Sequence, residues 1–371
     1  MDEHEEMFTS KPVIRVIGVG GGGGSAVNRM IDNDLKEVEY VVINTDCQVL
    51  RLSKAETRIQ IGKNVTNGFG AGGKPEKGKE SALENIDDIR ACVEGADLVF
   101  ITAGMGGGTG TGAAPIVAQC AKEAGCLVVG FVTKPFSIEG KLRMHNALQG
   151  IEEMRPYVDT LVVIPNDKLL QVIGTNTPYI EALAEVDDVL RQGVEGISEI
   201  INRPGIISLD FADITTVLKN KGNALMGIGK ASGPNRAVEA ARSAISSPLL
   251  EVDINGATDA IVQIISDDQL TMKEVEDAMQ EIRRASSTDI DIIQGTALNL
   301  DLDGEVVVIV IATGFDSIKA QEKDQFEESK DENYKDKDKQ DEETEKQDFD
   351  GVNKGQKPKT KVPSWLTTRF R

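Results

Sequence analysis

The chain has 371 residues, of which 40% are hydrophobic, 27% are charged and 4% are aromatic. This length predicts about two or three domains, and the hydrophobic fraction is sufficient for a sizeable core. A formal net charge of -20 at pH 7 argues against nucleic acid as a partner and against direct adsorption to anionic lipid. Because self-association of so acidic a chain needs cation screening, we expect potassium and magnesium to matter beyond any active site.

The residue types also argue against membrane-spanning and secreted proteins and against histidine-based sites. The longest apolar run, residues 306–312, is far short of the roughly 20 residues that a membrane-spanning helix needs. The acidic start of the chain does not suit a signal peptide, so we expect a cytoplasmic protein without direct membrane insertion. With only two histidines, His4 and His145, neither a histidine triad nor a histidine metal site is expected, and we assign no metal ligands. Reduced core thiols are predicted at Cys47, Cys92, Cys120 and Cys126, which lack paired or metal-ligand spacing.

The first predicted strand, residues 13–17, leads through a glycine loop at 18–24 into a helical pattern. Gly18, Gly20 and Gly23 satisfy G-x-G-x-x-G. Alone, this pattern is compatible with a dinucleotide-dependent oxidoreductase, in which Asp46 after the next strand would bind the ribose. A lone motif of this kind is more often a tight strand-to-helix turn, so it decides nothing by itself.

A second glycine-rich segment, residues 68–74, has the spacing of a Walker A loop. Pro75 stands where the magnesium-binding Ser or Thr is required, which excludes a P-loop enzyme. The third loop, residues 104–112, lies between an apolar run at 98–101 and a helical pattern that opens at Ala113. Glycines before a helix N-terminus let backbone N–H groups approach an anion. Three such loops predict that several segments converge on one phosphorylated ligand.

The apolar runs through about Pro178 alternate with helical stretches and predict a parallel sheet with helices on both faces and ligand at the carboxyl ends of the strands: residues 13–17, 40–43, 98–101, 127–132 and 161–164. A helix of about 26 residues, roughly 39 Å long, is then predicted from Thr177 and Pro178 to a stop at Arg203-Pro204-Gly205.

Residues 206–316 have the pattern of a second α/β unit, and the composition then changes to Glu, Asp, Lys, Gln and Ser to about Lys357. Such a segment cannot bury enough apolar surface to fold and is predicted to be a disordered linker. The last segment contains the only tryptophan, Trp365, beside Leu366 and arginines. It is either a frayed terminus or a short motif that folds on a partner.

The motif Gly-Gly-Gly-Thr-Gly-Thr-Gly at residues 106–112 resembles the signature of the tubulin/FtsZ family, and the chain is similar to its FtsZ branch of bacterial division GTPases. The match runs from about Val13 to Phe315. It includes the following segments and residues in order: Asn44-Thr45-Asp46, Thr133-Lys134-Pro135-Phe136, Glu139, Arg143, Ile164-Pro165-Asn166-Asp167 and Asp210-Phe211-Ala212-Asp213.

The resemblance implies an α/β architecture in which a Rossmann-like parallel-sheet GTPase domain is joined by a long central helix to a second, smaller α/β domain. A disordered acidic linker and a short C-terminal peptide would follow. The expected boundaries are a flexible leader at 1–12, a GTP-binding domain at 13–177, the central helix at 178–204, an activation domain at 205–316, the linker at 317–358 and a partner-binding peptide at 359–371.

The resemblance also implies a GTP/GDP site, with Mg²⁺ accompanying the nucleotide and K⁺ as a further cation. Phosphate contacts are expected from Gly20, Gly21, Gly22, Gly23, Gly24, Gly107, Gly108, Thr109 and Gly110, with Ala71, Gly72 and Gly73 near the γ-phosphate. By family resemblance Thr133, Glu139, Arg143 and Asn166 surround ribose, phosphate and base, and Asp187 accepts hydrogen bonds from the guanine edge. From the residues alone, Glu139, Arg143 and Asp187 would be solvated helix surface.

Asp210 and Asp213 are the catalytic candidates. On sequence alone they are an N-cap and a first-turn acid of an ordinary helix. The resemblance implies that they enter the nucleotide site of the next subunit and orient the attacking water, so that hydrolysis requires polymerisation.

The implied function is a GTPase that polymerises head to tail into filaments of the mid-cell division ring. Its terminal peptide would bind a membrane tether or regulators of the FtsA, SepF or ZipA type. Two rivals stay open: a divergent regulator with weak or no hydrolysis, and a dinucleotide-dependent oxidoreductase. The chain departs from the family pattern at Gly24-Ser25, Lys74, Leu183 and Ser208, so base contacts and hydrolysis are expected to be weaker than usual.

Overall fold

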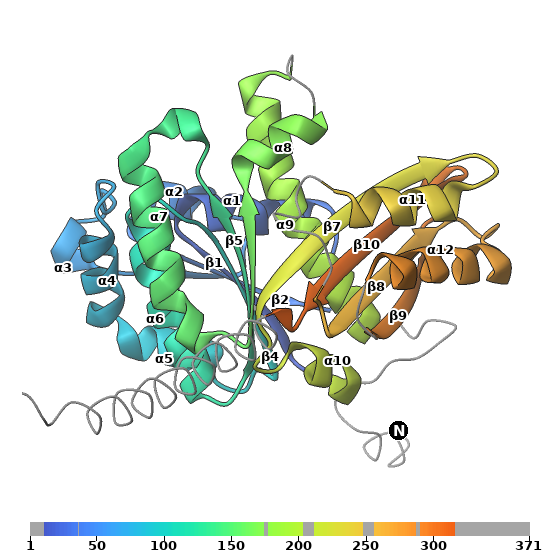
Figure 1. Cartoon of the computed structure of the whole chain (residues 1–371). Helices are drawn as coiled ribbons and strands as arrows, with labels where there is room; N and C mark the ends of the chain where they lie inside the picture. The colour runs from blue at the N-terminus through green and yellow to red at the C-terminus, as the bar shows by residue number, and fades with distance from the viewer. Residues whose placement is uncertain are drawn as a thin grey trace, which may run out of the picture. The chain divides into compact units, whose positions relative to one another are not determined.

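The computed structural model describes residues 11–35, 37–173, 177–202, 211–247, 256–286 and 290–315. The N-terminal half contains six parallel strands in the order β3-β2-β1-β4-β5-β6, of which β1, β2, β4 and β5 are labelled in Figure 1. Their bounds are β1 Ile14–Val19, β2 Glu39–Asn44, β3 Thr57–Gln60, β4 Leu98–Gly104, β5 Leu127–Lys134 and β6 Thr160–Pro165. The five strands predicted in this half are therefore confirmed, and the polar edge strand β3 is added.

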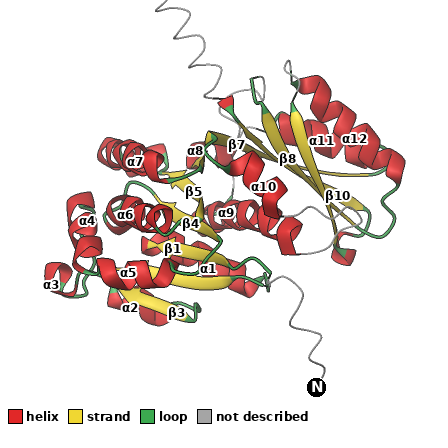
Figure 2. Ribbon diagram, turned by 90° about the horizontal axis from the view of Figure 1, so that it is seen from below, coloured by secondary structure: helices red, strands yellow, loops and turns green. Residues whose placement is uncertain are grey.

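Helices cover both faces of this sheet (Figure 2). Buried residues of α4, α5, α6 and α7 pack with one set of strand side chains, and those of α1, α9 and α10 pack with the other. The bounds are α1 Gly20–Asp32, α2 Cys47–Leu52, α3 Lys63–Thr66, α4 Pro75–Glu84, α5 Ile86–Val93, α6 Thr109–Glu123, α7 Lys141–Met154, α8 Asn166–Ile173, α9 Tyr179–Asn202 and α10 Phe211–Leu218. This arrangement is the predicted parallel sheet between two helical layers.

The long predicted helix is α9, which has 24 residues and therefore a length of about 36 Å. It lies between the two halves of the fold (Figure 2). A Cβ atom at Gly193 would lie 2.5 Å from Cε1 of Phe131 in β5, while one at Gly196 would lie 3.4 Å from Cδ1 of Ile309 in β10. The helix therefore packs on both sheets through its small residues. The predicted stop at residues 203–205 lies outside the described residues.

Four strands form the second half: β7 Gly222–Ser232, β8 Asp259–Ser266, β9 Asp291–Leu298 and β10 Glu305–Thr313, in the order β7-β10-β8-β9. The helices α11 Arg236–Ile245 and α12 Met272–Ala285 pack on one face of these strands. Residues 222–224 of β7 pair in parallel with β6, and residues 225–232 pair antiparallel with β10. One strand thus joins both halves into a continuous ten-stranded order.

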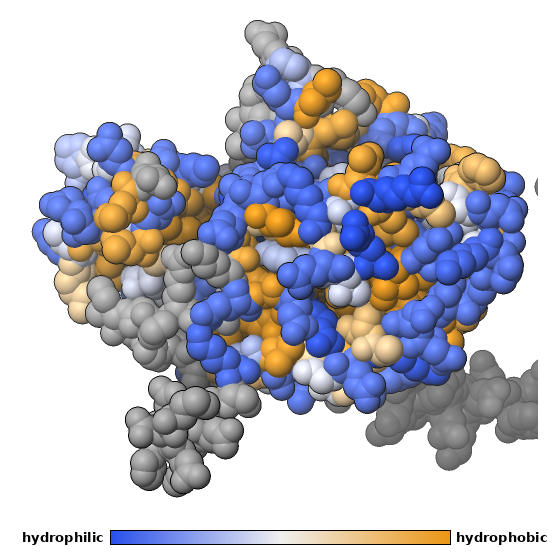
Figure 3. All heavy atoms as spheres, turned by 180° about the vertical axis from the view of Figure 1, so that it is seen from behind, coloured by the Kyte–Doolittle hydropathy of each residue, from blue (hydrophilic) through white to orange (hydrophobic). Residues whose placement is uncertain are grey.

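The four cysteines are free, as predicted, but only Cys120 and Cys126 are core residues, whereas Cys47 and Cys92 are partly buried. Desolvation still raises the pKa of the Cys92 thiol to about 12. None of the described helices is long and apolar enough to cross a membrane. The rear face of the molecule is mostly hydrophilic, with hydrophobic residues in separate patches (Figure 3). The leader to residue 10, Ser208, Asp210, the predicted linker and the terminal peptide lie outside the described residues.

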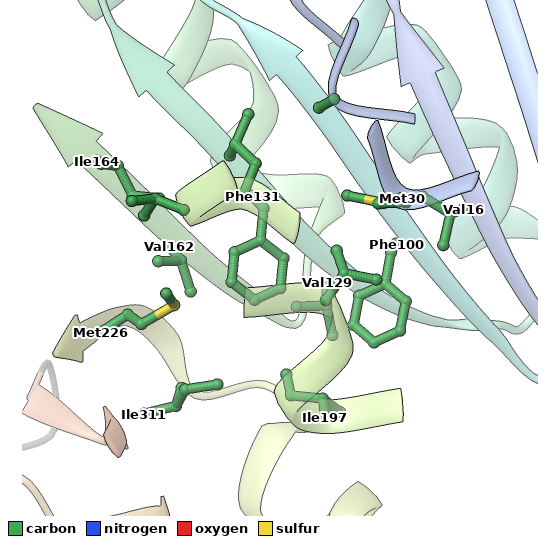
Figure 4. Packing of buried hydrophobic residues seen from close by; sticks show 14 of the residues in the cluster. Val16, Met30, Phe100, Val129, Phe131, Val162, Ile164, Ile197, Met226 and Ile311 are labelled. Carbon is green, nitrogen blue, oxygen red and sulfur yellow. The ribbon is translucent and has the colours of Figure 1, made fainter. Parts of the chain in front are cut away.

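The largest hydrophobic cluster joins side chains from both halves (Figure 4). Phe131 in β5 and Phe100 in β4 are fully buried, with ring centroids 6.1 Å apart. Met226 of β7 and Ile311 of β10 belong to the same cluster. The two halves therefore share one core.

Phe131→Ala is expected to lower the free energy of unfolding by about 3–5 kcal/mol, because it removes a buried ring and leaves a cavity between β5 and α9. Denaturant titration measures the change. Leu52→Ala is the control, since Leu52 is 79% exposed and its loss should change stability by less than about 0.5 kcal/mol. Equal transitions for the two variants would contradict the shared core.

Candidate functional site

A cavity of about 430 Å³ lies at the carboxyl ends of β4, β5 and β6, between the first and third glycine loops and α9. Its walls are Gly21, Gly22, Ser25, Gly104, Met105, Gly107, Gly108, Thr109, Gly110, Thr133, Pro135, Glu139, Arg143, Asn166, Leu183, Val186 and Asp187. Segments from residue 21 to residue 187 therefore converge on one pocket, at the edge of the sheet where parallel α/β folds bind ligands.

Most of the predicted binding residues line this pocket. They are Gly21, Gly22, Gly107, Gly108, Thr109, Gly110, Thr133, Glu139, Arg143, Asn166 and Asp187. Six others do not line it: Gly20, Gly23, Gly24, Ala71, Gly72 and Gly73. These six lie in the same loops or at the helix starts that follow them.

Gly20 and Gly23 allow neighbouring backbone segments to lie in close contact. At Gly20, where φ is +75°, a Cβ atom would lie 2.7 Å from the backbone N of Gly110, so a side chain would push the first and third loops apart. At Gly23, a Cβ atom would lie 2.2 Å from the carbonyl oxygen of Thr102, which brings α1 close to β4. The pattern G-x-G-x-x-G is thus explained in part by packing.

The second glycine segment packs on the third loop. A Cβ atom at Gly108 would lie 2.7 Å from Cβ of Ala71 and 2.9 Å from the backbone N of Lys74. The three glycine-rich segments therefore pack against one another, while their convergence on one phosphorylated ligand stays a prediction. Asp46, which the oxidoreductase alternative needs at a ribose, instead caps α2 by accepting hydrogen bonds from the N–H groups of Gln48 and Val49 at 2.8 and 3.3 Å.

Threonine hydroxyls stabilise the third loop. Thr109 and Thr45 share a buried hydrogen bond of 2.7 Å between their Oγ1 atoms. Thr111 Oγ1 accepts the N–H of Gly106 at 2.8 Å. Because α6 begins at Thr109 and has no acidic residue in its first turn, its N-terminal N–H groups and dipole present a positive end to the pocket. This end suits an anion such as a phosphate.

Two further polar residues of the pocket lining, Asn166 and Asp187, suit a nucleobase. Asn166 is only 6% exposed, and its Oδ1 atom has no hydrogen-bond partner within the described part of the chain. Asp187 lies on α9, and its pKa is raised to about 6, chiefly because it is desolvated by burial; Asp188 adds to the rise and Arg29 opposes it. A buried acceptor without a partner is costly, so a donor from a ligand would satisfy Asn166.

Glu139 and Arg143 form an ion pair at the rim. Arg143 Nη1 donates to Glu139, whose other oxygen accepts the N–H of Phe136 at 2.9 Å. Both residues line the pocket, so the expectation from residue type alone, a purely solvated helix surface, is too simple. The positive charge of Arg143 is therefore partly neutralised by Glu139 before any ligand binds.

Sequence reasoning did not assign Gly104, Met105, Pro135 or Val186 to the site, and it noted Ser25 and Leu183 only as departures. Met105 donates its N–H to the carbonyl of Thr133 at 3.0 Å, and Val186 continues the apolar stripe of α9. Their residue types are those of a core, so only their position next to the glycine loops could have identified them.

Asp213 lies far from the pocket of its own chain. It is exposed in the first turn of α10, and the carbonyl of Leu218 at the other end of α10 accepts a hydrogen bond from Thr160 at the start of β6. The pocket residue Asn166 follows the end of β6. The six residues of β6 therefore separate Thr160 from Asn166 by about 20 Å. Figure 1 shows α10 and α8 at opposite ends of the sheet.

The comparisons with known proteins agree with this geometry. The family model "Tubulin/FtsZ family, GTPase domain" matches residues 13–174, and "FtsZ family, C-terminal domain" matches residues 222–316. The chain is 42% identical to an FtsZ dimer from M. jannaschii with a TM-score of 0.81, over 84% of this chain and 91% of that chain.

Two CetZ structures from Haloferax volcanii show likeness of fold alone. A GTPγS-bound protofilament of CetZ2 is 20% identical with a TM-score of 0.70, over 86% of this chain and 99% of that chain. A GDP-bound monomer of CetZ1 is 24% identical with a TM-score of 0.69, over 81% and 94%. Taken with the two family models and the M. jannaschii match, the pocket and its fold lead to one conclusion: the chain belongs to the FtsZ group of the tubulin/FtsZ family of GTPases.

Proposed function

We propose that the chain binds GTP in this pocket and hydrolyses it after head-to-tail assembly, when α10 of one subunit approaches the pocket of the next. The observation that carries the proposal is the separation of Asp213 from its own pocket along the length of β6. A single subunit holds both halves of the machinery at opposite ends, so a second subunit is needed to bring them together.

The binding half of the proposal assigns each wall a role. The N–H groups at the start of α6 and the glycines on either side would hold the phosphates, Asn166 would accept a hydrogen bond from the nucleotide, and ionised Asp187 would accept from the guanine edge. Mg²⁺ would bind chiefly through phosphate oxygens and water, as it commonly does at such sites. Potassium and magnesium in solution would also screen the net charge of -20.

The catalytic half rests on Asp210 and Asp213. Asp213 is exposed in the first turn of α10, where it can face another subunit, and Asp210 lies outside the described residues. Carboxylates at this place would orient and polarise the attacking water, which suits a reaction that depends on positioning and charge more than on covalent chemistry.

Exposed apolar side chains next to the pocket support assembly through this end. Ile138 and Leu142 are 79% and 74% exposed and neighbour Glu139 and Arg143 in sequence, and Phe69 in the second glycine segment is 83% exposed. Large exposed apolar side chains next to a binding pocket are compatible with an interaction surface. A subunit docked here would bury them over the nucleotide.

The wider biological role is proposed on family membership. The filaments would form the division ring at mid-cell in the cytoplasm, and residues 359–371 would attach them to a membrane tether or regulator of the FtsA, SepF or ZipA type through the linker 317–358. The domain boundaries expected from sequence are retained in this proposal. The regulator alternative, with weak or no hydrolysis, is favoured by the departures at Ser25, Lys74, Leu183 and Ser208, and GTP-dependent pelleting compared with GDP decides between them.

Gly107→Ala should weaken GTP and GDP binding about tenfold, or ~1.4 kcal/mol. No atom lies within 4 Å of a Cβ placed at Gly107, so the fold tolerates the methyl group while a phosphate approaching the backbone does not. Equilibrium binding of labelled nucleotide measures the effect. Gly196→Ala, which meets only ordinary contacts with Ile309, is the control. Gly108→Ala is less informative, because its methyl group would strike Ala71. Full affinity in Gly107→Ala would exclude the phosphate assignment.

GDP affinity should fall as the pH is lowered through about 6. The pKa of Asp187 is raised from 3.8 to about 6, so the carboxylate is ionised above that pH and takes up a proton below it, losing an acceptor for guanine. The terminal phosphate of the nucleotide titrates in the same range. Asp187→Asn retains only the phosphate titration, and should bind about tenfold more weakly at pH 8. If the two pH profiles are parallel, Asp187 does not contact the base.

Asp213→Ala should leave GTP binding unchanged and slow hydrolysis, because the carboxylate serves the neighbouring subunit. In mixtures with the wild type, turnover per wild-type subunit should fall as mixed interfaces form. Asp87→Ala is the control, since it removes the same charge from a side chain that is 97% exposed on α5. Turnover that simply follows the wild-type fraction would show that the site is not shared.

A further inference from the structure

The last turn of α10 is held by two buried threonines, one from each half of the fold. Thr160 Oγ1, at the start of β6, donates to the carbonyl of Leu218 at 2.5 Å. Thr313 Oγ1, at the end of β10, donates to the carbonyl of Val217 at 3.1 Å. Both threonines are fully buried. Two of the helix C-terminal carbonyls, which have no partner within the helix, are therefore fixed by side chains.

Asp159 holds the turn that follows α10. Its carboxylate accepts the N–H of Asn220 at 3.3 Å, and its backbone carbonyl accepts the N–H groups of Lys221 and Gly222 at 2.9 and 3.0 Å. The same carboxylate accepts from Lys122 Nζ at 2.6 Å and from the N–H of Val128 at 2.9 Å. This side chain is 2% exposed, so the turn is tied to α6 and β5 through one buried group.

A displacement of the last turn of α10 is expected to displace its first turn as well, because the helix is short. The helix has eight residues, about 12 Å, and buries Ile214, Val217 and Leu218 on one face. Asp213 stands exposed in the first turn. Because so short a helix moves as a rigid body, the hydrogen bonds at its C-terminus determine where Asp213 lies relative to the two halves of the fold.

We infer that Thr160 and Thr313 are positioning residues for hydrolysis. Each fixes the position of Asp213 relative to one half of the fold. This inference rests on the proposed function, in which Asp213 acts on the nucleotide of the next subunit. Neither threonine lines the pocket. Their loss therefore leaves nucleotide binding intact and displaces the carboxylate that a subunit offers to its neighbour.

The test replaces each hydroxyl by a methyl group of the same shape. Thr160→Val and Thr313→Val are expected to keep wild-type Kd values for GDP and to pellet with GTP, while kcat per pelleted subunit falls about tenfold, since small misplacements of a catalytic group are costly. Thr160→Ser, which retains the hydroxyl, should restore kcat. Thr102→Val is the matched control, because Thr102 is a fully buried strand threonine whose hydroxyl has no partner among the described residues.

Mixing variant subunits with wild-type subunits shows at which subunit's pocket hydrolysis is slowed. Thr160→Val subunits added to the wild type should depress turnover at wild-type pockets, because they present a displaced Asp213 to them. The inference is overturned if the Thr160 and Thr313 variants turn over GTP like Thr102→Val, or if Kd for GDP rises as much as kcat falls. Failure of the proposed function looks different: the wild type itself would not hydrolyse GTP, or Asp213→Ala would turn over at the wild-type rate.

Discussion

The pocket depends on the close approach of three glycine-rich segments at the carboxyl ends of the parallel strands. A Cβ atom would lie 2.7 Å from the backbone N of Gly110 if placed at Gly20, and 2.7 Å from Cβ of Ala71 if placed at Gly108. Gly22 would meet Cα of Gly104 at 3.3 Å. Because the backbones touch directly, the start of α6 is left open to the pocket, and its N–H groups supply a positive end in addition to the Arg143 side chain at the rim. A chain of net charge -20 can in this way hold an anion.

The second constraint is the shared core of the two halves. The cluster around Phe131 includes residues of β5, α9, β7 and β10, and β7 pairs with both β6 and β10. Gly193 lets α9 approach the ring of Phe131. A change in the angle between the two sheets would therefore have to repack the same side chains that support Leu183, Val186 and Asp187 at the pocket.

The sequence predicted the strands and loops well because buried parallel strands are continuous apolar runs and because glycines precede the helices. The edge strand β3, Thr-Arg-Ile-Gln, has no such run and was missed. The sequence assigns Gly20 and Gly23 to phosphate, which stays a prediction, and it did not indicate that both also allow close contact between neighbouring backbone segments. The unsatisfied oxygen of Asn166 depends on what surrounds it after folding, which no local pattern records.

The polarity of a parallel sheet explains why the pocket and α10 lie at opposite ends of β6. All six N-terminal strands point the same way, and the segments that follow β1, β4, β5 and β6 line the pocket, whereas the amino end of β6 lies about 20 Å away. Thr160 and Asp159, at the amino end of β6, hold α10, while Asn166 follows its carboxyl end. Stacking subunits along the strand direction brings opposite ends together without any rearrangement of the sheet. Under the proposed function, in which Asp213 of one subunit acts on the nucleotide of the next, the direction of the strands would link hydrolysis to assembly.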